Sequence, residues 1–232
     1  MAYWQLNQTR GDAALDQRID NHIDAKLQPI TEGITKLRED VAYLKAKVED
    51  ATAGKVVGFS KLPTTEILDN LPVISKTINE ARAKQLISPP EAVAELRSKL
   101  AQVQPRNPQF WPAVSNVISY QSMIAEKMGL LPNAGKVKKT SCHYISVGEG
   151  AHVSVDGFRF AGCSQQIDNF SLSNGTFENS IIIYEGGPLH LQNVTFKNCL
   201  FIVSFPVVPS PPAQKLGQAL LATIGTLPNF TL

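Results

Sequence analysis

The sequence has few of the features that identify a catalytic or cofactor-binding protein. It contains no phosphate-binding loop, dinucleotide-binding fingerprint, nucleophile elbow or EF-hand loop. Its 4 histidines and 3 cysteines show no spacing typical of a zinc site. A formal net charge of +2 is too small for the basic surface of a nucleic-acid-binding domain, and no apolar run approaches the ~20 residues of a membrane span. We therefore expect no cofactor, no metal ion, no nucleic acid and no membrane contact.

Cysteine is too scarce for a disulfide framework. The cysteines are Cys142, Cys163 and Cys199, an odd number, and buried reduced thiols explain them as small apolar residues. A disulfide between Cys142 and Cys163 stays open. The first residues lack the positive start and apolar segment of a secretory signal. We expect a reducing, cytoplasmic location.

A repeat is the most informative feature that is present. A phrase of about eleven residues is written three times, as VSVDGFRFAGC from Val153, FSLSNGTFENS from Phe170 and LHLQNVTFKNC from Leu189, with starts about 17 and about 19 residues apart. Positions one and three are apolar, which is typical of a short strand with one buried face. A turn-prone Asp-Gly, Asn-Gly or Asn follows.

Two further positions recur in every copy of the phrase. The eighth position is Phe (Phe160, Phe177, Phe196) and the eleventh is small (Cys163, Ser180, Cys199). A second strand follows the small residue, most clearly in Ser180–Tyr184 and Cys199–Phe205. If each repeat is one coil and the coils stack, the two positions form interior columns, as in a parallel β-helix. The pattern resembles the right-handed parallel β-helix superfamily, which includes pectate-lyase-like and phage tailspike proteins. The resemblance covers the last third of the chain and implies fold rather than activity.

The N-terminal part reads as a long helix over residues 13–51. Its apolar residues follow a heptad seam from Ile30 onward, with Ile34, Val41 and Val48 at position a and Leu37, Leu44 and Ala51 at position d. β-Branched residues at a and Leu at d favour a parallel dimer. Pro29 and Gly33 predict a kink or two segments. Self-association through residues 13–51 is the first interpretation, and packing within the chain or on another protein is the alternative.

The order of these elements predicts an α+β protein: an N-terminal long helix or coiled coil over residues 1–54, a small helical segment over residues 55–135, and a short parallel β-helix with a C-terminal capping helix over residues 136–232. Ala53–Gly58 reads as a hinge. Prolines divide residues 65–128 into three helical pieces, and we expect these to pack on or cap the first coil. An amphipathic stretch over residues 213–224 reads as the C-terminal cap, and the apolar tail after it is expected to dock.

Catalysis has one tempting location. Glu185 and His190 flank a Gly-rich corner, Glu-Gly-Gly-Pro-Leu-His, where a carboxylate and an imidazole could perform acid–base chemistry. Turn formation explains the same residues. We expect a non-enzymatic scaffold or interaction protein, a homo-oligomer or partner-binding protein that presents a rigid surface. The alternatives are a phage- or virus-type trimeric fibre component, and a carbohydrate-active β-helix enzyme, so carbohydrate stays open as a ligand.

Overall fold

The computed structural model describes residues 2–105, 107–130, 152–223, 225 and 227–232, and within these the side chains of all but residues 2–25, 44–46 and 48–50. Helices and mainly parallel strands make it an α+β protein, as expected. The chain forms two compact units, Met1–Asp50 and Ala51–Leu232. Each is considered by itself below.

A single helix, α1 (Ala2–Lys61), forms the first unit and contributes its last turns to the second. Of the kink or two segments predicted at Pro29 and Gly33, the division into two segments is wrong, because the helix continues through both residues. The hinge predicted at Ala53–Gly58 is wrong for the same reason. A proline inside a helix removes one hydrogen bond and each glycine costs about 1 kcal/mol of helix propensity, and the many remaining hydrogen bonds of so long a helix outweigh these losses.

Four shorter helices belong to the second unit: α2 (Thr64–Ala83), α3 (Pro90–Gln102), α4 (Phe110–Lys127) and α5 (Pro211–Ala222). The three helices predicted between residues 65 and 128 are confirmed. Pro90 occupies the first turn of α3, where its missing N–H would have no intrahelical partner in any case. Pro72 lies inside α2 without ending it.

The strands confirm the repeat and its register. They are β1 (Val153–Asp156), β2 (Arg159–Ala161), β3 (Ser164–Gln166), β4 (Phe170–Glu178), β5 (Ile181–Tyr184), β6 (Leu189–Lys197), β7 (Leu200–Val203) and β8 (Phe230–Thr231). One sheet has the order β1-β4-β6-β8 with β2 also on β4, and the other has the order β3-β5-β7. All pairs except β6–β8 are parallel. Val153 pairs with Phe170, which pairs with Leu189, so the first residue of every phrase is aligned.

Residues with positive φ recur at two positions of the phrase. Position five is Gly157 (φ 65°), Asn174 (φ 50°) and Asn193 (φ 54°), and position ten is Gly162 (φ 64°), Asn179 (φ 49°) and Asn198 (φ 50°). Glycine and asparagine are the residues that tolerate this left-handed conformation best. Each phrase therefore bends twice at fixed places, and the repeated bends keep successive repeats in register.

The two predicted interior columns are present. Phe177 and Phe196 are fully buried and stack with ring centroids 5.3 Å apart and planes inclined by 7°, while Phe160 lies 5.6 Å from Phe177. The small column is buried as well, through Cys163, Ser180 and Cys199. A ring at one repeated position and a small residue at the other let adjacent repeats pack without a void.

Helix α4 covers the open edge of β7. Three buried serines on one face of α4 accept hydrogen bonds from alternate backbone N–H groups: Ser122 Oγ from Phe201 at 2.9 Å, Ser119 Oγ from Val203 at 3.0 Å and Ser115 Oγ from Phe205 at 2.6 Å. The spacing i, i+4, i+7 places the hydroxyls on one side of the helix. In this way the helix supplies hydrogen-bond acceptors for the backbone N–H groups along the edge of β7, which would otherwise be free to pair with another strand.

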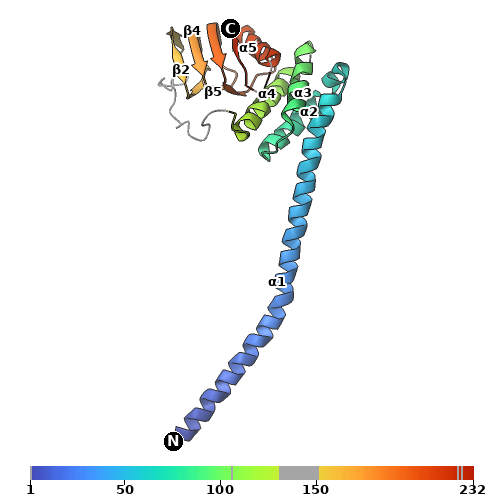
Figure 1. The fold of residues 1–232 in the computed structure, drawn as a ribbon, viewed down its shortest axis with the longest axis vertical. Helices are drawn as coiled ribbons and strands as arrows, with labels where there is room; N and C mark the ends of the chain where they lie inside the picture. Colours follow the sequence, from blue (N-terminus) through green and yellow to red (C-terminus); the bar gives the residue numbers. More distant parts are fainter. Residues whose placement is uncertain (1, 106, 131–151, 224, 226) are drawn as a thin grey trace. The chain divides into compact units, whose positions relative to one another are not determined.

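The prediction that the helices cap the first coil is therefore wrong, because α4 contacts the last strand of its sheet. Figure 1 shows the strands side by side, with α4 next to them and α2 and α3 beyond α4. Helices and strands share one hydrophobic core, so the boundary expected near residue 135 does not divide two cores. The signal for this arrangement lies in the serines of α4, whose partners are distant in sequence.

The C-terminal tail docks as predicted. β8 pairs antiparallel with β6, and Leu232 and Val194 exchange backbone hydrogen bonds of 2.9 and 2.7 Å. Phe230 packs 5.0 Å from Phe196, at the end of the Phe column. The predicted C-terminal helix is confirmed as α5, which buries Leu216, Leu220 and Leu221. The tail thus pairs with part of the outer edge of β6.

Candidate functional site

The Glu185–His190 corner is organised by a carboxylate from the preceding repeat. Asp168 is buried, and it accepts hydrogen bonds from the backbone N–H of Glu185 at 2.9 Å and of Gly187 at 2.6 Å. A Cβ at Gly187 would lie 2.9 Å from Asp168 Oδ1, so this approach requires glycine. Tyr184 donates its hydroxyl to the Gly187 carbonyl at 2.9 Å. These contacts give the Gly-rich corner a structural role.

Glu185 and His190 are both exposed. Glu185 accepts a hydrogen bond from Gln166 Nε2 at 3.2 Å, and His190 lies on β6 in register with Ser171. Within the described residues no hydrogen bond or ion pair joins Glu185 to His190. The geometry therefore assembles no acid–base pair from these two side chains.

The heptad seam is exposed wherever its side chains are described. The exposed fractions are 51% for Ile34, 67% for Leu37 and 57% for Val41. Leu44 and Val48, the other predicted seam residues, have side chains outside the described set. Leu27 and Ile30 extend the same seam toward the N-terminus and are 50% and 58% exposed. This continuous apolar stripe has no covering segment among the described residues.

The cysteines divide into two chemical states. Cys163 is disulfide-bonded, whereas Cys199 is a free, buried thiol. Cys142, which the sequence leaves open as a partner of Cys163, lies outside the described residues. The expectation of reduced thiols throughout is therefore wrong for Cys163. Burial raises the pKa of the Cys199 thiol to about 11, so this cysteine is an inert core residue.

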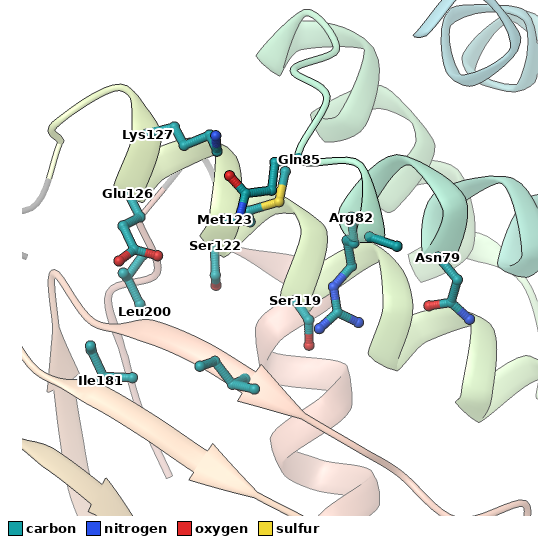
Figure 2. Close-up of a pocket in the computed structure, with 12 residues that line it drawn as sticks. Asn79, Arg82, Gln85, Ser119, Ser122, Met123, Glu126, Lys127, Ile181 and Leu200 are labelled. Carbon is teal, nitrogen blue, oxygen red and sulfur yellow. The ribbon is translucent and has the colours of Figure 1, made fainter. Parts of the chain in front are cut away.

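A cavity of about 760 Å³ lies between the end of α2, the C-terminal half of α4 and the outer face of β5 and β7. Figure 2 shows its polar wall, with Arg82 extending from α2 toward the strands and Ser119 and Ser122 on α4. Its floor is apolar and includes Ile181 and Leu200. We call this space and its polar wall the Arg82 groove. It combines an apolar surface with a cation, which is the composition of many small-molecule sites.

A second cavity of about 280 Å³ adjoins the Arg82 groove. It shares Arg82 and Ile202 with the first cavity, and Glu185 also lines it. Ile202 is 45% exposed, although it belongs to a strand whose other face is core. Arg82 thus lines both cavities, together with the partly exposed side chain of Ile202.

Arg82 differs from Arg97 and Arg159, the other arginines that the structure describes in this unit. Arg159 forms an exposed ion pair of 2.9 Å with Glu178. Arg97 is buried and donates to Gln121 Oε1 at 2.9 Å and to the carbonyls of Thr223 and Gly225 after α5. No carboxylate or hydrogen-bond acceptor among the described residues pairs with the Arg82 guanidinium, and partial burial lowers the pKa of Arg82. Arg82 is therefore a partly desolvated cation with unused donors.

Sequence reasoning missed Arg82. Its helix carries a buried stripe that includes Ile74, Ile78 and Ala81, so a basic residue directly after Ala81 reads as a solvated flank. The outer face of β5 and β7, which forms the floor of the groove, is about 100 residues further along the chain.

Comparison with protein-family models, with curated proteins and with solved structures gave no match. None of the helices within the described residues is both long enough and apolar enough to cross a membrane. In the same part of the chain no three His, Cys, Asp or Glu side chains gather in a way that would hold a metal ion.

Proposed function

We propose that this protein is a non-enzymatic, self-associating scaffold, in which two copies pair through a parallel coiled coil and present short capped β-helices. The observation that carries the proposal is the exposed seam of Ile34, Leu37 and Val41 on α1. Large aliphatic side chains at consecutive a and d positions lose contact with water when an identical helix supplies the opposing seam.

The energetics favour a partner for this helix. At 1.5 Å per residue, the 60 residues of α1 extend over about 90 Å. Burying an aliphatic side chain completely contributes roughly 1.5–3 kcal/mol, and the seam residues retain half or more of that surface. Several such residues in each copy provide the surplus needed to offset the entropy of association.

Charge pattern supports a parallel arrangement. In the heptad register with Ile34 at a, Asp40 occupies position g and Lys45 occupies position e of the next heptad. A parallel pair brings g of one helix to the following e of the other, so Asp40 meets an opposite charge. An antiparallel pair would bring the e positions together, and both Arg38 and Lys45 are basic.

The strand-rich part suits display rather than catalysis. Parallel repeats in register, two bends per phrase and stacked Phe rings support its interpretation as a short parallel β-helix. The serine face of α4 and the pairing of β8 on β6 protect its C-terminal edges. The turn contacts of Asp168 account for the corner that had suggested an enzyme.

The test is the mass of the full chain in solution, measured by light scattering over a range of concentrations. We expect about twice the 25.3 kDa chain mass. Leu37→Lys should give the single-chain mass, because it places a charge in the seam. Thr35→Lys makes a charge change at the exposed b position nearby and serves as the control, which should remain paired. A single-chain mass for the unaltered protein would overturn the proposal, and a threefold mass would favour the trimeric fibre alternative.

A further inference from the structure

We propose that the Arg82 groove binds a small monocarboxylate with an apolar body, whose carboxylate is held by the Arg82 guanidinium. The proposal does not depend on self-association, because every residue involved belongs to the second compact unit. It rests on three features of the groove: an unpaired cation, an apolar floor of matching size, and a hydroxyl with an unused hydrogen.

The first feature is the uncompensated guanidinium. A partly buried charge without a partner costs stability, and mutation readily removes it when nothing requires it. The guanidinium presents its N–H groups in a planar fork that matches a carboxylate through two parallel hydrogen bonds. No described residue occupies that fork, although Arg97 and Arg159 in the same unit are both engaged.

The second feature is the aliphatic surface next to the cation. Ile181, Leu200 and Ile202 lie on the outward row of β5 and β7, in the alternation opposite to the core residues Ile182 and Phe201. Of these, Ile202 is 45% exposed and Ile181 is partly exposed, whereas Leu200 is already buried against Ala125 of α4. Outward residues of a solvated strand are ordinarily polar. Here they line a cavity of about 760 Å³, which is within the range that encloses most of a small organic ligand. An apolar ligand body would cover this surface while the head group stays at Arg82.

The third feature is Ser122. Its Oγ accepts the Phe201 N–H at 2.9 Å, and its own hydrogen has no acceptor among the described residues. Ser119, one turn earlier, donates its hydrogen to the Val203 carbonyl at 3.2 Å. Ser122 therefore retains a donor in the wall of the groove, fixed by the contact of α4 with the strand edge. A bound carboxylate or another ligand oxygen can accept it.

The local charge selects a monoanion over a phosphate. The other cation that lines the large cavity, Lys127, is preceded by Glu126, which also lines it. Their charges offset one another, so Arg82 supplies a single net positive charge. A carboxylate matches this charge, whereas a phosphate monoester carries about two negative charges at neutral pH. Glu185, which lines the adjoining cavity, would repel a second anionic group.

The experiment uses the full chain and decanoate as the probe, with binding measured by titration calorimetry below the concentration at which decanoate forms micelles. We expect saturable binding of one decanoate per chain. Arg82→Met retains the apolar stem and removes the cation, and it should weaken binding at least about tenfold. Lys84→Met makes the same charge change on an exposed side chain outside the cavity, and it should leave affinity within about twofold of the original.

Two further measurements separate recognition from folding. Arg82→Met should unfold at the same temperature as the unaltered chain or higher, because it removes an unpaired charge. Decyltrimethylammonium has the same apolar body with a positive head, and it should not compete with decanoate. The proposal is overturned if the unaltered chain shows no saturable binding, if Arg82→Met binds decanoate as well as the unaltered chain, or if decyltrimethylammonium competes equally.

Discussion

Replacing Ser119 by alanine tests the covering of the β7 edge. Ser119 is 3% exposed, accepts the Val203 N–H at 3.0 Å and donates to the Val203 carbonyl at 3.2 Å. Alanine leaves both groups of Val203 without partners in a buried site, and an unsatisfied buried group costs about 1–3 kcal/mol. The better helix propensity of alanine returns at most roughly 0.5 kcal/mol. Because two such groups lose their partners, we expect a net loss of at least about 1.5 kcal/mol in the free energy of unfolding.

Urea unfolding followed by circular dichroism measures this loss, with an unchanged dependence on denaturant as evidence that the folded state is otherwise intact. Ser98→Ala is the matched control, since Ser98 is exposed on α3 and should change stability by less than about 0.5 kcal/mol. Amide exchange at Val203 should also accelerate in Ser119→Ala. Equal stability of Ser119→Ala and the unaltered chain, with unchanged exchange at Val203, would refute the edge-covering role of α4.

Three other predictions concern the repeat. Gly175→Ala should destabilise the protein by about 1–3 kcal/mol in urea unfolding, because a Cβ there would lie 2.1 Å from the Phe158 ring; Gly54→Ala, where a Cβ meets nothing, should not destabilise it. Hydrogen bonds from neighbouring side chains lower the pKa of Asp156 in the folded protein. Its contribution to the free energy of unfolding is therefore fully present above the pKa of the unfolded state and is lost as pH falls through the pKa of the folded state. Acid titration of Asp156→Asn should lack this loss. Burial raises the pKa of Cys199 to about 11 from 9.0, so stability should fall between about pH 9 and about pH 11. Cys199→Ala should make that fall smaller, while the buried Tyr184, whose pKa burial also raises, retains its own contribution.

The strand register was predictable because the repeat carries it locally. Alternating apolar residues, a Phe at position eight and a small residue at position eleven depend only on neighbouring positions and on stacking of like on like. The second bend, at Gly162, Asn179 and Asn198, was not predicted, although glycine and asparagine share a tolerance of positive φ.

The arrangement of the helices was not predictable in the same way. Ser119 reads as an ordinary polar residue in a helix, and its role depends on Val203, which lies 84 residues away. Arg82 likewise lies in a groove whose floor is formed by β5 and β7, two strands that follow much later in the chain. Local pattern indicates which face of an element is buried, whereas the identity of the covering element depends on packing between distant segments.

The most direct test of self-association is the distance between two copies of the same residue. Lys26 is exposed and occupies position g of the heptad register, so Lys26→Cys can carry a spin label in a chain whose Cys142 and Cys163 are replaced by serine, while the buried Cys199 thiol stays unlabelled. In a parallel pair in register, dipolar spectroscopy should give a narrow distance distribution of about 20–30 Å between the labels, set by helix diameter and label length. A distance of about 40 Å or more would indicate an antiparallel pair, and the absence of any coupling between chains would contradict the account.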